Sequence, residues 1–426
     1  MIRAARLGRA VRAAASDITP LRESPAFRRL FAGQAISQAG TQMTLVAVPL
    51  QVYAITRSSL DVGLVGIVGL VPLIAFGLYG GAIADAVDRR ALVLVTSTAS
   101  MLVSAALLVQ AALHVNQVGL LFGCVAVQAG FAAADSPARR AVMPQLLRRE
   151  VLPAANTLVY GSMTLAVIAG PLLAGAAIAA GGYQWAYAAD VVSFGGALYA
   201  AARLPRLRPG EGARRAGLAS VAEGLRYLAR NRVVLMTFLV DITAMLFASP
   251  RALFPALAHD QFGGGVRTAG LLYAAPAVGA FAATAAGGAI ARVRRQGFGV
   301  VVAIAVWGIA VAGFGMVPAL WLGLLLLVAA GAADTVSTIY RSTMLQVATP
   351  SGMQGRLQGV YFVVVTGGPR LGDIRAGGMA DALGARMSVV SGGIACVAGI
   401  VLLALAVPAF MRYDARQAVT GELPAA

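Results

Sequence analysis

The chain has 426 residues, of which 59% are hydrophobic and only 12% charged, and its formal net charge is +17. Soluble globular proteins carry about 25% charged residues, so this composition excludes a set of soluble domains, and it also excludes a disordered or disulfide-stapled chain. The apolar residues come in blocks of about 20, the length that crosses a ~30 Å hydrocarbon core as a helix. We therefore expect an all-α membrane protein with about twelve transmembrane helices.

Twelve apolar segments predict the membrane-spanning helices, at 28–56, 61–84, 91–113, 117–138, 151–180, 184–203, 233–259, 268–291, 297–316, 319–347, 357–382 and 386–411. The longest polar stretch separates them into six and six. The predicted organisation is a cytoplasmic N-terminal tail (1–27), a six-helix bundle (28–203), a cytoplasmic linker (204–232), a second six-helix bundle (233–411) and a cytoplasmic tail (412–426).

The charge excess predicts orientation and does not require a nucleic-acid partner. All 34 basic residues are Arg, and 27 of them lie in the tails, the linker and the loops of one side. The opposite loops hold three, Arg57, Arg267 and Arg386. Because positively charged loops stay in the cytoplasm, we expect a multi-pass protein of the cell membrane with both termini cytoplasmic.

The loop after the second span contains Gly81, Asp85, Asp88, Arg89 and Arg90. Gly81 allows two helices to approach closely, and Asp85 at a helix end can accept hydrogen bonds from a neighbouring helix N-terminus or pair with Arg. These features predict a latch that closes the cytoplasmic side, although the two Arg alone would equally serve as membrane anchors. The pattern resembles the signature loop of the major facilitator superfamily, from which it departs at positions 86 and 88.

Two further features agree with that resemblance. The pentapeptide at 80–84, Gly-Gly-Ala-Ile-Ala, recurs at 287–291, at the inner end of the second predicted span of each half. Two parallel six-helix repeats are the architecture of this superfamily. In the fifth span, Gly170-Pro171 resembles the Gly-Pro motif of drug/proton antiporters, where Pro kinks the helix and small residues allow close packing. This motif favours efflux over uptake.

Ionisable residues inside the spans cost at least a few kcal/mol and are functional candidates. In the first half, Asp135 and Arg139 are four residues apart and are expected to form a local ion pair that acts as a gate or brace. Asp190 lies one or two turns from the outer end of the sixth span, where we expect it to be partly hydrated.

The seventh and tenth spans carry Asp241 with Arg251 and Asp334 with Arg341. In a continuous seventh helix, the first two lie about 12 and 27 Å from its inner end and on different faces. Asp334 and Arg341 share one face about 10 Å apart, as if to flank a polar pathway; for Arg341, snorkelling to the surface is an alternative. Asp241 and Asp334 are the proton-binding candidates, because burial disfavours a charged carboxylate. For Asp241, a satisfied helix–helix hydrogen bond is an equal alternative.

The eleventh span is irregular around Arg370 and Asp373, which are three residues apart and are expected to pair. The Gly and Pro residues beside them predict a hinge or a cavity lining. Together with Arg251, Arg341 and Arg375, Arg370 makes four Arg inside the spans, which would suit an anionic or catecholate-like cargo.

Segments 250–258, 270–275, 343–346 and 355–357 resemble a subgroup of the superfamily that contains enterobactin exporters and multidrug efflux pumps. The resemblance implies a proton-driven exporter of siderophores, drugs or related small molecules that works by alternating access as a monomer. The alternatives are an uptake symporter on the same fold and a non-transporting sensor or scaffold. The sequence contains no phosphate-binding loop, metal-ligand spacing or nucleophilic triad, so we expect no enzyme activity, no cofactor and no metal, with the proton gradient as the energy source.

Overall fold

The computed structural model describes residues 17–86, 88–204, 226–229, 231–290, 293–349 and 351–414, and within these ranges the chain forms helices and no strand. The first half consists of α2 (Thr19–Glu23), α3 (Pro25–Thr56), α4 (Ser59–Ala86), α5 (Arg89–Ala112), α6 (Val118–Leu146), η1 (Arg149–Val151), α7 (Leu152–Gly181) and α8 (Tyr183–Ala202).

The second half begins with a broken helix, and the linker at 205–225 lies outside the described residues. The elements are α10 (Arg232–Ala248), η2 (Arg251–Leu253), α11 (Phe254–Asp260), α12 (Val266–Ala285), α13 (Gly287–Ile290), α14 (Gln296–Met316), α15 (Leu320–Ala348), α16 (Ser351–Leu383), α17 (Ala385–Ala406) and α18 (Pro408–Met411).

Local chemistry explains where several helices begin and end. The Ser24 hydroxyl accepts a hydrogen bond from the Phe27 N–H at 3.1 Å, and Asn231 caps α10 in the same way through the Val234 N–H at 3.2 Å. Each cap satisfies an amide that has no partner inside its helix. Gly182 and Gly384 have φ of +86° and +90°, and they turn the chain between α7 and α8 and between α16 and α17.

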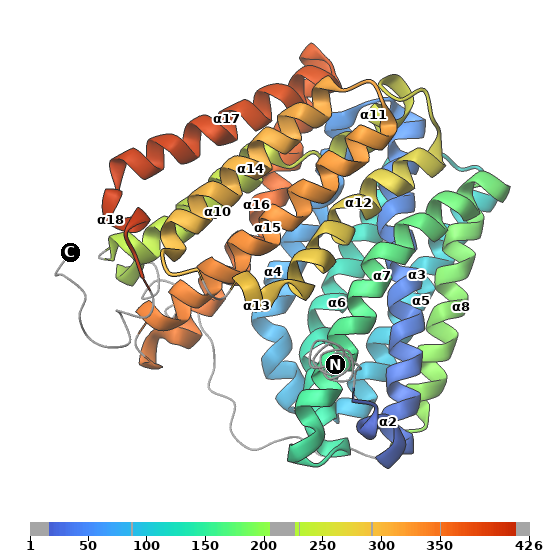
Figure 1. The fold of residues 1–426 in the computed structure, drawn as a ribbon. Coiled ribbons are helices and arrows are strands. Elements are labelled where there is room, and N and C mark those ends of the chain that lie inside the picture. The colour runs from blue at the N-terminus through green and yellow to red at the C-terminus, as the bar shows by residue number, and fades with distance from the viewer. Residues whose placement is uncertain are drawn as a thin grey trace, which may run out of the picture.

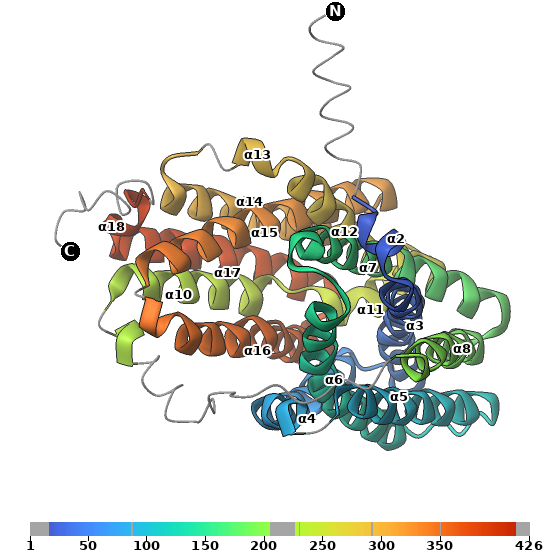
Figure 2. The ribbon, with the colours of Figure 1, turned by 90° about the horizontal axis from the view of Figure 1, so that it is seen from below.

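The helices form two bundles, one from each half of the chain (Figures 1 and 2). In the N-terminal bundle α3 packs against α7 and α8, α5 packs against α8, and α4 packs against α6. In the C-terminal bundle α14 packs against α15 and α17, α12 packs against α15, and α10 packs against α16. Helical segments that are long and apolar enough to span a membrane number nine among the described residues. The predicted all-α membrane fold is therefore confirmed, whereas the count of twelve spans stays a prediction, because α3, α8 and α16 are not among the nine.

The bundles meet along two helix pairs, α4 with α16 and α7 with α12. Gly63 of α4 faces the Asp373 carbonyl, and a Cβ atom on Gly63 would lie 2.6 Å from that oxygen. Gly270 of α12 likewise faces the Pro171 carbonyl of α7, where a Cβ would lie 2.6 Å away. Both contacts involve the start of one helix and the later part of its partner. We call this side of the molecule, where α4 and α12 begin, the closed end.

Away from the closed end the two bundles diverge (Figure 1). Among the residues whose surroundings are described, the glycine contact between α4 and α16 that lies farthest from the closed end is Gly367 against Leu70, and beyond it Val71 and Phe76 are exposed. On α7, Tyr160, which lines the cavity between the bundles, is exposed as well. The molecule is therefore closed at one end and open between the bundles at the other.

The two copies of the repeated pentapeptide differ in structure. Residues 80–84 lie within the uninterrupted helix α4. In the second copy α12 has already ended at Ala285, and Gly287–Ile290 form the separate short helix α13. The expectation that both copies end the second span of their half is thus met only in the first half.

Candidate functional site

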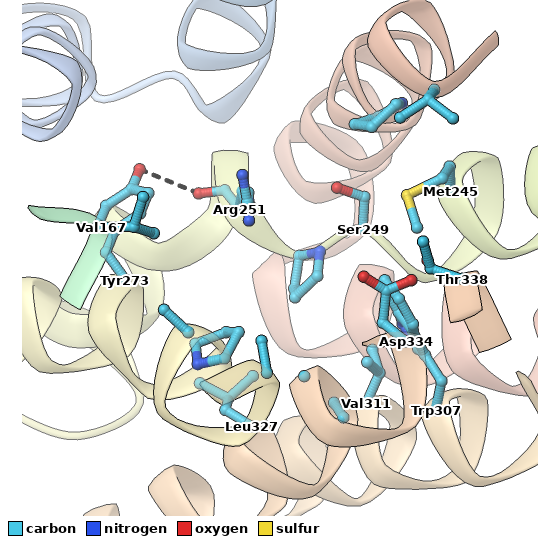
Figure 3. Close-up of a pocket in the computed structure, with 18 of the residues that line it drawn as sticks. Val167, Met245, Ser249, Arg251, Tyr273, Trp307, Val311, Leu327, Asp334 and Thr338 are labelled. Atoms are coloured by element: carbon cyan, nitrogen blue, oxygen red, sulfur yellow. Dashed lines mark hydrogen bonds between the residues drawn. The ribbon is translucent and has the colours of Figure 1, made fainter. Parts of the chain in front are cut away.

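A cavity of about 420 Å³ lies between α7 and the C-terminal bundle (Figure 3). The N-terminal bundle contributes one wall, formed by Tyr160, Met163, Thr164 and Val167 of α7. All the ionisable acidic and basic residues that line it come from the C-terminal bundle, and they are Asp241, Arg251, Asp334 and Arg341. These four are among the residues that the sequence nominates for proton coupling or the cargo pathway.

The seventh predicted span is broken where it borders the cavity. Helix α10 ends at Ala248, and Ser249 and Pro250 separate it from η2 and α11. Pro250 has no N–H to continue the helical hydrogen bonds, so the break leaves backbone groups without partners inside the helix. It also corrects the expectation that Asp241 and Arg251 lie apart on a continuous helix, because both line the same cavity.

Side chains from α14 and α16 satisfy the broken backbone. Arg375 donates from Nε to the Leu246 carbonyl at 2.8 Å and from Nη2 to the Phe247 carbonyl at 2.7 Å. Trp307 Nε1 donates to the Ala248 carbonyl at 3.0 Å. A cation at the C-terminal end of a helix also agrees with the helix dipole. Arg375 is therefore engaged in structure and is not available to bind cargo.

Arg375 and Trp307 donate hydrogen bonds to the end of α10, whereas Asp373 accepts hydrogen bonds at the start of η2. Its Oδ1 accepts hydrogen bonds from Ser249 Oγ at 3.1 Å and from the Ala252 N–H at 3.3 Å. Among the described ion pairs, none joins Asp373 to Arg370, so the predicted pair is wrong. Ser249 Oγ and the Ala252 N–H bind the Asp373 carboxylate in place of Arg370. Helix α16 itself continues through Pro369, which lines the cavity as expected.

Asp241 and Arg341 form a buried ion pair across α10 and α15. Arg341 Nη1 lies 2.5 Å from Asp241 Oδ1, and the two side chains are only 3% and 4% exposed. Arg341 also donates from Nε to Ser337 Oγ at 3.1 Å and from Nη2 to Thr338 Oγ1 at 3.2 Å. The guanidinium therefore does not snorkel to the surface but is fixed within the bundle.

Asp334 is the acid in the cavity without a direct partner. Its Oδ1 is buried and has no hydrogen-bond partner among the described residues. Arg341, Asp241 and Arg251 are the charged residues that line the same cavity. Figure 3 shows Asp334 beside Thr338 and Trp307, directed into the cavity. A carboxylate oxygen that is buried without a hydrogen bond is costly in the charged form, so this position favours a bound proton or a ligand that compensates the charge.

The four Arg of the spans do not form one anion site. Arg341 is paired and Arg375 binds backbone carbonyls. Arg370 packs its aliphatic part against Gly66 of α4, and its Nη1 is buried without a hydrogen-bond partner in the described part of the chain. Only Arg251, which is exposed, lines the cavity without an ion pair among the described residues. The structural basis for an anionic cargo is therefore weaker than the sequence suggests.

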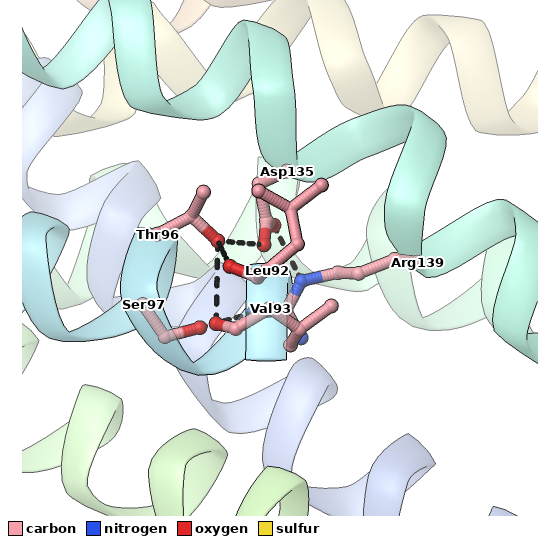
Figure 4. Close-up of polar contacts among 6 residues, drawn as sticks. All are labelled: Leu92, Val93, Thr96, Ser97, Asp135 and Arg139. Atoms are coloured by element: carbon pink, nitrogen blue, oxygen red, sulfur yellow. Dashed lines mark hydrogen bonds and ion pairs between the residues drawn. The ribbon is translucent and has the colours of Figure 1, made fainter. Parts of the chain in front are cut away.

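Asp135 and Arg139 form the predicted ion pair within α6 (Figure 4). Thr96 Oγ1 of α5 donates to Asp135 Oδ1 at 2.7 Å, and Arg139 Nη2 donates to Ser97 Oγ at 2.7 Å. The four side chains join α5 to α6, and none of them lines the cavity. This arrangement agrees with the brace that the sequence favours.

Asp190 lies in the interior of the N-terminal bundle and is fully buried. It accepts hydrogen bonds from Thr44 at 2.7 Å, Ser104 at 2.8 Å, Ser193 at 3.4 Å and Thr41 at 3.5 Å. The expected partial hydration is therefore wrong, because hydroxyl groups of α3, α5 and α8 replace water. Asp190 does not line the cavity.

The structure describes only part of the signature loop. Gly81 and Asp85 belong to the last turns of α4, but their surroundings and the side chain of Arg89 lie outside the described residues. Asp88 caps α5 by accepting from the Arg90 N–H at 2.8 Å, which explains an acid where Gly is usual. The Arg90 side chain donates to the Ala202 carbonyl at 2.8 Å and so joins α5 to the end of α8.

The Gly-Pro motif lies at contacts of α7 with both bundles. A Cβ on Gly170 would approach Gln42 of α3 to 2.3 Å, and the Pro171 carbonyl faces Gly270 of α12. Gly175, one turn further on, faces the Val266 carbonyl of α12, where a Cβ would lie 2.9 Å away. Helix α7 is nevertheless continuous through Pro171. The motif thus provides close approach at the closed end.

Sequence reasoning missed several residues of the site. Ser249 and Trp307 bind the broken helix, Tyr273 Oη donates to the Arg251 carbonyl at 3.1 Å, and Tyr361 lines the cavity. The Ser249-Pro250 dipeptide was the available signal for a break. Nothing local identifies the aromatic residues, because aromatic side chains are common in any membrane helix. Among the described residues no group of three or more His, Cys, Asp or Glu could hold a metal ion.

Comparisons of the sequence agree with this geometry. A family model described as Transmembrane secretion effector matches residues 15–422. The enterobactin exporter of Shigella boydii serotype 18 is 29% identical over 394 residues, which cover 91% of this chain and 92% of that protein. The enterobactin exporter of Citrobacter koseri is 28% identical over 396 residues, with the same two coverages.

Solved structures share the fold at low sequence identity. The nucleoside transporter NupG is 13% identical and superposes with a TM-score of 0.72, covering 91% of this chain and 100% of that one. A bacterial homologue of the iron transporter ferroportin is 14% identical with a TM-score of 0.66, covering 91% and 99%. These likenesses extend over both bundles and establish a major facilitator fold.

Proposed function

Because the chain belongs to the Transmembrane secretion effector family of the major facilitator superfamily, we propose that this multi-pass membrane transporter is a proton-driven exporter of siderophores, drugs or related small molecules. It is a secondary transporter and not an enzyme. The observation that carries the proposal is the cavity between the bundles, which is closed at one end and holds an unpartnered acid, Asp334, next to a buried ion pair.

The cargo assignment is supported by chemistry and by the relatives. Two relatives over most of the chain are named enterobactin exporters, which favours a siderophore as cargo. The cavity walls are largely apolar and aromatic, including Phe254, Tyr273 and Trp307. Such walls suit a cargo with ring systems and leave room for drugs of similar character. The protein is proposed to act as a monomer, since each chain contains a complete cavity.

The proton is proposed to bind at Asp334, with the Asp241–Arg341 pair as its electrostatic neighbour. When Asp334 is charged, the lining groups Asp241, Arg251, Asp334 and Arg341 are neutral in sum, and when it is protonated their sum is +1. Protonation therefore changes the charge balance of the cavity by one unit. That change gives the protein a means to favour the cargo-free form when a proton enters.

Alternating access is supported by the asymmetry between the two ends. The start of α4 lies at the closed end, and the distribution of Arg predicts that this end faces outward with both termini in the cytoplasm. In this orientation the structure is open to the cytoplasm, ready to load cargo for export. The inner end would close when Asp85 and its loop meet the start of α16.

Transport by inside-out membrane vesicles tests the proposal. With enterobactin or ethidium outside, an acidic lumen should drive accumulation into the lumen, and an uncoupler should abolish it. Accumulation that the uncoupler leaves intact contradicts proton coupling. Uptake that requires an alkaline lumen indicates a symporter, and no movement of either probe in folded protein favours the sensor or scaffold.

The inner latch needs its own test. Asp85→Asn should reduce turnover in the same vesicles while the amount of folded protein stays at the wild-type level. Asp88→Asn is the matched control, because Asp88 caps α5 within one bundle. Normal turnover of Asp85→Asn argues against the inner latch.

A further inference from the structure

A carboxylate from one bundle caps a helix of the other at the closed end. Asp381 lies in the last turn of α16, and its Oδ1 accepts from the Ser59 N–H at 2.8 Å. Its Oδ2 accepts from Ser58 Oγ at 2.6 Å and from the Leu60 N–H at 3.2 Å. These three hydrogen bonds cross from the C-terminal to the N-terminal bundle. Asp381 is exposed and was not a candidate from sequence.

The start of α4 depends on this carboxylate for its cap. Helix α4 begins at Ser59, and the first amide groups of a helix have no partner inside it. Ser58 Oγ accepts from the Asp61 N–H at 3.1 Å, which leaves the Ser59 and Leu60 amides to Asp381. A negative charge at a helix N-terminus is favourable, and hydrogen bonds to a charged acceptor are stronger than neutral ones. The cap is complete only while the bundles touch.

Close backbone contacts position the carboxylate. A Cβ on Gly377, one turn before Asp381, would lie 2.3 Å from the Ser59 carbonyl, and a Cβ on Gly63 would lie 2.6 Å from the Asp373 carbonyl. Contacts thus step by four residues along both helices, which run in opposite directions. Because no side chain separates the two backbones, the last turn of α16 lies directly on the first turn of α4.

We propose that Asp381 is a positioning residue for transport, which holds the outer end closed by capping α4 across the bundle contact. Each of the two helices carries an acid within its last three residues, Asp85 in α4 and Asp381 in α16. In the present conformation Asp381 caps α4. In the opposite conformation this cap is broken, and the inner latch proposed above for Asp85 takes over. This inference rests on the proposed alternating access, and it supplies the outer counterpart of the latch expected from the sequence.

The Asp381 cap closes the outer end and the proposed Asp85 latch closes the inner end. Because both ends do not close at once in alternating access, the two contacts compete. Opening the outer end exposes the Ser59 and Leu60 amides to water, whereas the proposed inner latch stabilises the inner end when it closes. Each conformation thus keeps one latch and loses the other, so neither conformation is much more stable than the other. Removing one carboxylate should shift the populations by about tenfold toward the other conformation.

Electron-spin distance measurements on the full chain in lipid nanodiscs test the outer latch. Spin labels at Leu113→Cys and Leu383→Cys, both exposed and near the closed end, are introduced after Cys124 and Cys396 are replaced by Ala. The wild-type background should give mainly the short distance. Asp381→Ala should raise the ratio of long to short distances about tenfold, and Asp381→Asn, which keeps one acceptor oxygen, should raise it less.

Two further variants make the result specific. Asp61→Asn removes an acid from the same first turn of α4 without touching the bundle contact, and it should leave the distances unchanged. Adding Asp85→Asn to Asp381→Ala should return the ratio toward wild type. Unchanged distances in folded Asp381→Ala, or the same shift in Asp61→Asn, overturn the proposal. The measurement needs neither cargo nor a proton gradient, so its failure is distinct from a failure of the export assay.

Discussion

Asp190 in the N-terminal bundle is fully buried and Asp334 in the C-terminal bundle is partly buried beside the cavity, and the hydrogen-bond partners of the two acids differ. Four hydroxyl groups from three helices bind Asp190, whereas Asp334 Oδ1 has no partner among the described residues and faces the cavity. A carboxylate whose hydrogen bonds are satisfied contributes to structure, whereas one held without partners favours exchange with a ligand or proton. Burial alone therefore does not identify the functional acid. The hydrogen-bond partners of each carboxylate distinguish the two.

The ion pairs of the two halves differ in the same way. Asp135 and Arg139 join neighbouring helices of one bundle outside the cavity, and their side chains are 22% and 12% exposed. Asp241 and Arg341 line the cavity and are nearly inaccessible. The N-terminal bundle thus supplies an uncharged wall of the cavity, and the C-terminal bundle supplies the charges on which coupling is proposed to depend.

The largest expected effect follows from neutralising the unpartnered acid. Asp334→Asn should reduce proton-driven accumulation of enterobactin or ethidium in inside-out vesicles to the level of vesicles without the transporter. Exchange of labelled for unlabelled cargo without a gradient should continue, because the cavity keeps its shape. Full gradient-driven accumulation by Asp334→Asn would contradict the proposal that Asp334, and not Asp190, binds the coupled proton.

Breaking the cavity ion pair should be costly to the fold. Arg341→Met leaves Asp241 buried and unpaired, which lowers the free energy of unfolding by about 3–5 kcal/mol. Replacing both, as Asp241→Asn with Arg341→Met, should recover a large part of that loss. Arg139→Met in the more exposed pair should lower stability by only about 1 kcal/mol. Thermal unfolding in detergent measures the stability of all three variants. Equal losses of stability in Arg341→Met and Arg139→Met would contradict the expectation that the more buried ion pair matters more to the fold.

A methyl group at the contact between the bundles should act on conformation. Gly270→Ala places a Cβ 2.6 Å from the Pro171 carbonyl, and such overpacking costs about 1–3 kcal/mol. We expect the closed end to loosen, as an increased rate of modification of a cysteine introduced there. Gly161→Ala is the control, since no described atom outside its own stretch of helix lies within 4 Å of its Cβ position. Equal modification rates in the two variants would argue against close packing of α7 and α12.

The smallest effect is expected at the satisfied acid. Asp190→Asn keeps one acceptor oxygen, and the neighbouring hydroxyls can rotate to accept from the new amide. Its stability should fall by about 1 kcal/mol, and transport should stay near the wild-type rate. Loss of gradient-driven accumulation in folded Asp190→Asn would move proton coupling into the N-terminal bundle.

Local features of the sequence predict much of the fold. The lengths of the apolar segments give the helices, and the four-residue spacing of Asp135 and Arg139 gives their ion pair. Contacts between distant segments are different, because nothing in a single span specifies its partner. Arg341 pairs with Asp241, a hundred residues away, although Asp334 is the acid on its own helix face. Ser249-Pro250 is a local signal for a break in the helix, but nothing in the sequence shows that Arg375 and Asp373 bind the backbone and side-chain groups at that break.

Proton movement that accompanies cargo movement is the most direct test of the account. In proteoliposomes with a pH-sensitive dye inside, transport of enterobactin or ethidium in one direction should move protons in the other. Asp190→Asn should retain this signal and Asp334→Asn should lose it while cargo still exchanges. Opposed proton movement that persists in Asp334→Asn, or is lost in Asp190→Asn, would contradict the claim that the unpartnered acid of the cavity carries the proton.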